Sequence, residues 1–156
     1  DDECIERILS HGSHSAIIPT LGPSGLMRSG MLGESIAKKV RETSCEQQKM
    51  LEASRVGVLT GWGTDVSLDY YSSNPGSEFL LRKERGWTAV EMLEQATINS
   101  ARIIGMDDDL GTIKAGKIAD LVIVDGKPDE DIAVMTKYPW RILQAGKVAC
   151  AEGVIG

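Results

Sequence analysis

Residues 56–65 read VGVLTGWGTD, and this stretch decides the fold class. The apolar run Val56–Thr60 predicts a buried strand, and the two glycines that follow allow a tight backbone path toward Asp65. An amphipathic helix is expected over 89–104, because Thr88 begins a capping-box pattern just before it. A buried strand that is followed by amphipathic helices is typical of an α/β fold.

Helices and strands also alternate upstream of this stretch. Apolar residues at helical spacing predict a short helix over 2–10, and a buried strand is expected over 14–18. Four glycines and one proline predict a loop over 22–33. Residues 34–55 fit one helix or two, and 78–85 should form another.

The pattern changes after the long helix. Residues 111–113 and 119–125 favour strands, and Ala145-Gly146 between two apolar runs predicts a tight hairpin. Residues 1–104 therefore have an α/β pattern and 110–156 a mainly β pattern.

Composition excludes several classes of protein. The 156 residues carry a net charge of −6, so no basic excess is available to bind nucleic acid. No apolar run approaches the ~18 residues that a membrane helix needs. The three cysteines lie far apart without a CxxC pair, which argues against a disulfide framework and against a cysteine zinc finger. A reducing compartment, and hence a cytoplasmic location, is expected.

Asp65 is the leading candidate for a functional side chain. It follows a predicted buried strand, and α/β enzymes place metal ligands and bases at the carboxyl ends of strands. Aspartate is also common in turns, and the local residues leave that alternative open. Nearby Trp62, Tyr70 and Tyr71 could line a pocket or pack as ordinary loop residues.

Two other patterns give weaker evidence of a functional site. His11 and His14 are separated by Gly12 at the expected end of a helix and have no third ligand nearby, which favours an ordinary loop role. Residues 111–118 nearly match a phosphate-binding loop, but Ile118 lacks the hydroxyl group that such a loop needs. A strand, not a helix, is expected after it, so the motif is rejected.

Several segments, in the same order and at plausible spacing, resemble the metal-dependent amidohydrolase superfamily. They are Ile18–Leu21, Gly57–Asp65, Gly86–Gly105 and Leu110–Val122. The chain is most similar to the branch of imidazolonepropionase-like and prolidase-like hydrolases. The resemblance implies that 1–106 supplies strands seven and eight of a (β/α)8 barrel with their helices. It also implies that 107–156 is the C-terminal half of a small β-sandwich.

The resemblance implies a metal site as well. Enzymes of this superfamily hold one or two divalent metals, usually zinc, at the mouth of the barrel. Asp65 matches their aspartate at the end of strand eight, which ligates a metal and accepts a proton from the activated water. The other ligands of the family are a His-x-His, a carboxylated lysine or glutamate and two later histidines. They are expected upstream of residue 1, and His11 does not replace one of them.

We therefore expect the C-terminal part of a longer hydrolase that cleaves C–N bonds in small amide, cyclic amide or dipeptide-like substrates. The chain alone should be inactive, and it should associate with its missing N-terminal part or form a homo-oligomer. Two alternatives stay open. One is a deaminase or a phosphotriester-type hydrolase on the same scaffold. The other is a truncated, non-catalytic assembly partner.

Overall fold

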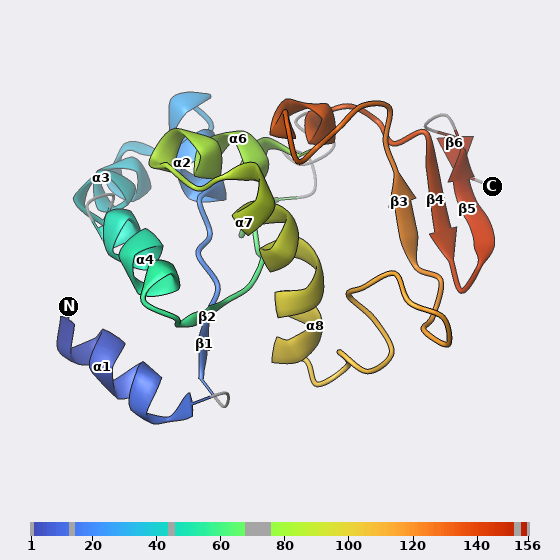
Figure 1. The fold of residues 1–156 in the computed structure, drawn as a ribbon. Coiled ribbons are helices and arrows are strands. Elements are labelled where there is room, and N and C mark those ends of the chain that lie inside the picture. The colour runs from blue at the N-terminus through green and yellow to red at the C-terminus, as the bar shows by residue number, and fades with distance from the viewer. Residues whose placement is uncertain (1, 13–14, 44–45, 68–75, 152–153, 156) are drawn as a thin grey trace.

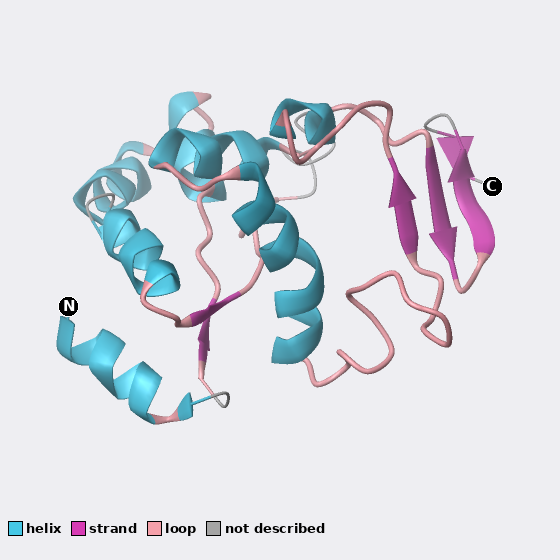
Figure 2. Ribbon diagram, in the orientation of Figure 1, coloured by secondary structure: helices cyan, strands magenta, loops and turns pink. Residues whose placement is uncertain are grey.

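The computed structural model describes residues 2–12, 15–43, 46–67, 76–151 and 154–155. A group of helices around two short strands lies beside a small antiparallel sheet, as Figures 1 and 2 show. No helix within these described ranges has the length and apolar character to span a membrane. The helices are α1 (Asp2–Ser10), α2 (Gly22–Arg28), α3 (Glu34–Thr43), α4 (Glu46–Arg55), α6 (Ser77–Arg85), α7 (Ala89–Glu94), the π-helical turn η2 (Gln95–Asn99), α8 (Ser100–Ile103) and the 3-10 helix η3 (Ile132–Thr136). The strands are β1 (Ala16–Ile17), β2 (Leu59–Thr60), β3 (Leu121–Ile123), β4 (Arg141–Gln144), β5 (Lys147–Ala151) and β6 (Val154–Ile155).

Strands β1 and β2 pair in parallel, with Ala16 opposite Leu59 and Ile17 opposite Thr60. The ladder continues for one more bond, because the Gly61 N–H donates to the Ile17 carbonyl oxygen at 2.9 Å. Both strands form where the apolar runs predicted them, but each has only two residues. The carboxyl ends of both strands therefore point to the same end of the molecule.

The predicted burial of the first strand was wrong. Ala16 is exposed, and the side chain of Ile18 just beyond the strand is 49% exposed. The second strand is better covered, since Val58 and Thr60 are both buried. The difference arises because helix side chains contact β2, whereas one side of β1 faces solvent in the described part of the chain.

Residues 22–28 form helix α2, where glycine content predicted a loop. Pro23 lies in the first turn of the helix, where the missing N–H costs no hydrogen bond. Gly22 and Gly25 are buried. A Cβ atom on Gly22 would lie 2.1 Å from the Thr64 carbonyl oxygen, so this glycine allows close packing and does not mark a flexible turn.

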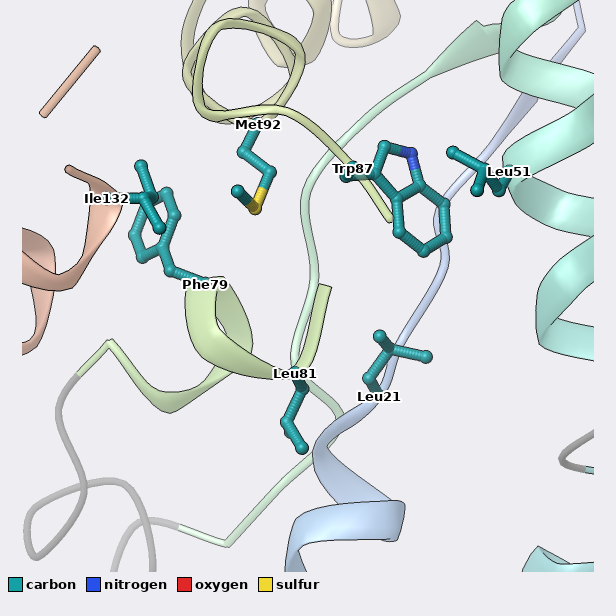
Figure 3. Close-up of a cluster of buried hydrophobic side chains, with 7 residues drawn as sticks. All are labelled: Leu21, Leu51, Phe79, Leu81, Trp87, Met92 and Ile132. Atoms are coloured by element: carbon teal, nitrogen blue, oxygen red, sulfur yellow. The ribbon is translucent and has the colours of Figure 1, made fainter. Parts of the chain in front are cut away.

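The hydrophobic core lies around α6 and the start of α7. Its buried members are Leu21, Leu51, Phe79, Leu81, Trp87, Met92 and Ile132 (Figure 3). Ile132 from η3 lies over the ring of Phe79, and Leu51 from α4 faces Trp87. Residues 34–55 form two helices, which is one of the two arrangements expected for that region, and the second of them contributes Leu51 to this core.

The helix predicted over 89–104 is present, and its capping box forms as expected. It contains the π-helical turn η2, which the sequence did not predict. Val90 is 52% exposed, while Met92 and Gln95 are buried. The buried side of the helix is therefore the one that packs on α6.

Strands β3 to β6 form an antiparallel sheet in the order β3-β4-β5-β6. The predicted hairpin joins β4 to β5, and Ala145 and Gly146 adopt φ angles of 49° and 77° in its turn. No strand forms at 111–113, which corrects the prediction. Gly111 is instead packed against the long helix, where an added Cβ would lie 2.8 Å from the Cβ of Ala101.

Candidate functional site at the carboxyl end of strand β2

Asp65 lies on the loop that leaves the carboxyl end of β2. Its side chain is exposed, so its carboxylate is accessible to a ligand. The backbone of Asp65 is left-handed, with φ at 52°. This conformation costs a non-glycine residue roughly 1–2 kcal/mol and persists only where the surrounding structure enforces it. Such outliers cluster at functional sites, which makes this position a candidate.

The segment before Asp65 packs tightly against the chain that leaves β1. A Cβ atom on Gly63 would lie 2.7 Å from Cγ2 of Ile18, and one on Gly22 would meet the Thr64 carbonyl oxygen. Residues with side chains could not be accommodated at either position without displacing a neighbour. The two strand ends are thus in close backbone contact directly next to Asp65.

A buried polar cluster lies under these strand ends. Arg82 on α6 has no exposed surface, and its Nε donates to Glu78 Oε1 at 2.9 Å. Its Nη1 donates to the Gly61 carbonyl oxygen at 3.2 Å and also to Gln95 Oε1. Its Nη2 donates to the Pro19 carbonyl oxygen. One guanidinium group therefore connects both strand ends, α6 and the π-helical turn.

Glu78 completes the cluster from the other side. Both of its carboxylate oxygens accept from the Leu21 N–H at 3.1 Å. Burial raises the pKa of Glu78 and lowers the pKa of Arg82, while the ion pair between them opposes both shifts. The Trp62 ring contacts Arg82 and Phe79, with 4.2 Å from its centroid to the Arg82 guanidinium carbon and 4.2 Å to the Phe79 ring centroid.

Side chains of the long helix bind the backbone of β2. Asn99 Nδ2 donates to the Thr60 carbonyl oxygen at 3.2 Å, and the Trp62 N–H donates to Ser100 Oγ at 3.2 Å. Ser100 Oγ in turn donates to the Gln95 carbonyl oxygen at 2.7 Å, five residues earlier. The π-helical turn therefore coincides with the point where the helix contacts the strand.

Of the other candidate residues, the structure describes His11 and Trp62. His11 is exposed, and its Nδ1 lies 2.7 Å from the Arg7 carbonyl oxygen, as an ordinary residue at a helix end. Trp62 is half-buried and packs on Arg82, which places it beneath the loop. His14, Tyr70 and Tyr71 lie outside the described residues.

Sequence reasoning missed the buried cluster. Its signal was present: Glu78 and Arg82 stand four residues apart and flank the apolar run Phe79–Leu81. Charged residues at this spacing usually form a solvated pair. Only their position on the buried face of α6 distinguishes this pair from a surface one.

The donor set can be compared with the needs of a divalent metal. Within the described ranges, no three His, Cys, Asp or Glu side chains come together in a way that could hold a metal ion. Asp65 offers an oxygen donor that suits such an ion, but metal sites in enzymes use three or more protein ligands. The described part of the chain therefore offers Asp65 as a single oxygen donor and forms no complete metal site.

Known proteins are similar in sequence to this chain over half of its length or more. An imidazolonepropionase from Streptococcus gordonii is 32% identical over 127 residues, which cover 74% of this chain and 38% of that protein. A 5-methylthioadenosine/S-adenosylhomocysteine deaminase from Symbiobacterium thermophilum is 31% identical over 99 residues, which cover 54% of this chain and 23% of that protein. The chain thus spans well under half the length of these relatives.

Solved structures are similar to this chain as well. A prolidase in complex with N-methylphosphonate-L-proline superposes with a TM-score of 0.83 at 29% identity, over 97% of this chain and 38% of the prolidase. An adenosine deaminase from Xanthomonas campestris with bound zinc has a TM-score of 0.64 at 20% identity, over 99% of this chain and 36% of that one. The second likeness concerns the fold alone. An α/β fold is common to these proteins and to this chain.

The family model of the Amidohydrolase family matches residues 5–143. The matched range includes both parallel strands, the loop of Asp65 and the long helix with its capping box. This chain belongs to the Amidohydrolase family.

Proposed function

We propose that this chain is the C-terminal part of an enzyme that hydrolyses a C–N bond in a small amide or cyclic amide. In this proposal, 1–106 contributes strands seven and eight of an eight-stranded barrel with their helices, and 107–156 contributes part of a β-sandwich. We call this chain together with the missing upstream part the intact enzyme. The observation that carries the proposal is the left-handed, exposed Asp65 at the carboxyl end of β2 in a member of this family.

Members of the Amidohydrolase family generally use divalent metals, and zinc is the ion we propose here. Asp65 would hold it through one carboxylate oxygen, and the remaining ligands would come from the upstream part of the intact enzyme. When bound, a divalent metal supplies a nucleophile at neutral pH by lowering the pKa of a coordinated water molecule.

The part of Asp65 in the reaction follows from its position and chemistry. An exposed carboxylate at a strand end can accept the proton that an attacking water molecule loses. The same carboxyl group can then return this proton to the nitrogen atom that leaves when the C–N bond breaks. Its backbone, fixed between two strand ends, keeps the carboxylate in one place during both transfers.

The test is an Asp65→Asn substitution in the intact enzyme. The amide keeps the size of the side chain but removes the proton acceptor, so kcat should fall by roughly 10²- to 10⁴-fold while the circular dichroism spectrum stays unchanged. Asp129→Asn, a change at an exposed residue after β3, is the matched control and should retain full turnover. Turnover of the Asp65 variant at the level of this control would exclude the proposed role.

A deaminase is the second candidate, because a 31% identical relative is a 5-methylthioadenosine/S-adenosylhomocysteine deaminase. Both reactions break a C–N bond, but a deaminase releases ammonia from its substrate. A panel of purine nucleosides, cyclic amides and dipeptides, assayed in parallel for ammonia and for amide cleavage, separates the two candidates. Release of ammonia from nucleosides alone would favour the deaminase.

A further inference from the structure

We propose that Arg82 is a positioning residue that acts with Glu78 and Gln95 to hold the backbone of Asp65 in its left-handed conformation. This inference rests on the proposed role of Asp65. It assigns a function to a buried cluster that does not itself face the exposed loop and would not touch a substrate.

The first connection between Arg82 and Asp65 is through the carboxyl end of β2. Arg82 donates to the Gly61 carbonyl oxygen, four residues before Asp65, and to the Pro19 carbonyl oxygen on the neighbouring chain segment. The Trp62 ring, next along the chain, stacks on the same guanidinium group at 4.2 Å. Arg82 therefore fixes the point from which the Asp65 loop departs.

The second connection between the cluster and Asp65 is through the segment that follows β1. Glu78 accepts from the Leu21 N–H, and the next residue, Gly22, lies against the Thr64 carbonyl oxygen. Thr64 immediately precedes Asp65. The ion pair of Glu78 and Arg82 thus constrains the Asp65 loop from two sides, through two segments that are far apart in the sequence.

The cost of burying the cluster indicates that it does more than add stability. Arg82, Glu78 and Gln95 are 0%, 2% and 3% exposed. A buried ion pair is on average no more stabilising than well-packed apolar side chains of similar size, but it can specify one conformation. Here the conformation it specifies includes a residue with an unfavourable backbone, and the hydrogen bonds to carbonyl oxygens have directions that apolar packing would not provide.

Arg82→Lys in the intact enzyme tests the proposal. Lysine keeps the charge next to Glu78, but its single ammonium group cannot reach Gly61, Gln95 and Pro19 together. We expect kcat to fall about 10- to 100-fold with KM changed less than about 3-fold, because the proton acceptor is misplaced while substrate contacts remain. Amide hydrogen exchange in peptides that cover 61–65 should become faster, without a similar change in α3 or α4.

Arg55→Lys is the matched control. Arg55 is exposed and also donates to a backbone carbonyl oxygen, that of Gly86, at 2.8 Å. The same chemical change at this position should leave both kcat and exchange over 61–65 as in the unchanged enzyme. If the Arg82→Lys enzyme fails to fold, its amides will exchange rapidly everywhere, and the Gln95→Met enzyme then provides the test. Methionine removes one of the acceptors of Arg82 but has nearly the size and shape of glutamine. It should speed exchange over 61–65 to a smaller extent.

Normal turnover and normal exchange over 61–65 in a folded Arg82→Lys enzyme would overturn the proposal. If the lysine variant does not fold, normal exchange over 61–65 in the Gln95→Met enzyme would overturn it. The exchange measurement does not depend on any activity. If the Asp65→Asn enzyme were fully active but Arg82→Lys still loosened 61–65, the proposed function would fail and the positioning role of the cluster would stand.

Discussion

Gly22 lies so close to the loop of Asp65 that a larger residue cannot occupy its position without displacing that loop. The sequence predicted Asp65 as a candidate, because it follows a strand in the order expected of α/β enzymes. It did not predict the role of Gly22, which was expected to belong to a loop. The function of this glycine depends on a backbone approach between residues that are 42 positions apart (64 − 22 = 42), and no local pattern reports such an approach.

Gly22→Ala should therefore destabilise the intact enzyme. The added Cβ would lie 2.1 Å from the Thr64 carbonyl oxygen and 2.2 Å from Cγ1 of Val66, so the backbone must shift. We expect a loss of about 1–3 kcal/mol in the free energy of unfolding, measured by urea titration. At Gly33 an added Cβ meets nothing within 4 Å, and Gly33→Ala should change stability by less than about 0.5 kcal/mol. Equal stability of the two variants would contradict the account of Gly22.

The long helix shows which features of an element can be predicted from neighbouring residues and which depend on the rest of the fold. Its start was predictable, because the capping box of Thr88 and Glu91 requires only residues within one turn. The π-helical turn was not predictable, since it forms where Asn99 and Ser100 bind the backbone of β2. Which side of the helix is buried is likewise not a local property, because it depends on where α6 packs.

The capping box should make helix stability depend on pH. Burial tends to raise the pKa of Glu91, but hydrogen bonds from Thr88 and the charge of Arg55 outweigh it, so the pKa lies below the ordinary value of a glutamate side chain. A carboxyl group with a lowered pKa stabilises the folded state above its unfolded pKa, and this contribution is lost as pH falls through the folded value.

The measurement compares the intact enzyme with its Glu91→Gln variant by urea titration between about pH 7 and about pH 3. Glutamine keeps a capping hydrogen bond but has no charge to titrate. The variant should be less stable near neutral pH, and the difference should shrink steadily below about pH 4.5. A difference that stays constant across this range would show that the Glu91 charge contributes nothing to the folded state.

At the scale of the whole molecule, several large apolar side chains of the described residues are exposed. Helix α1 has an apolar side but no buried residue, and the side chains of Ile18 and Ile104 are largely exposed. In the proposal such exposure is expected, because two strands cannot complete a barrel, which needs ~250 residues. In the proposal, the upstream strands of the intact enzyme cover these surfaces and bring the remaining metal ligands to Asp65.

The most direct test of this account is to read the coding sequence immediately upstream of Asp1. The account predicts an open reading frame of roughly 230 or more residues, enough for the rest of a barrel and the first part of a sandwich. It should contain a His-x-His motif, a later lysine or glutamate and two further histidines. A start codon directly before Asp1 would contradict it, because Asp65 would then have no partner ligands in its own chain.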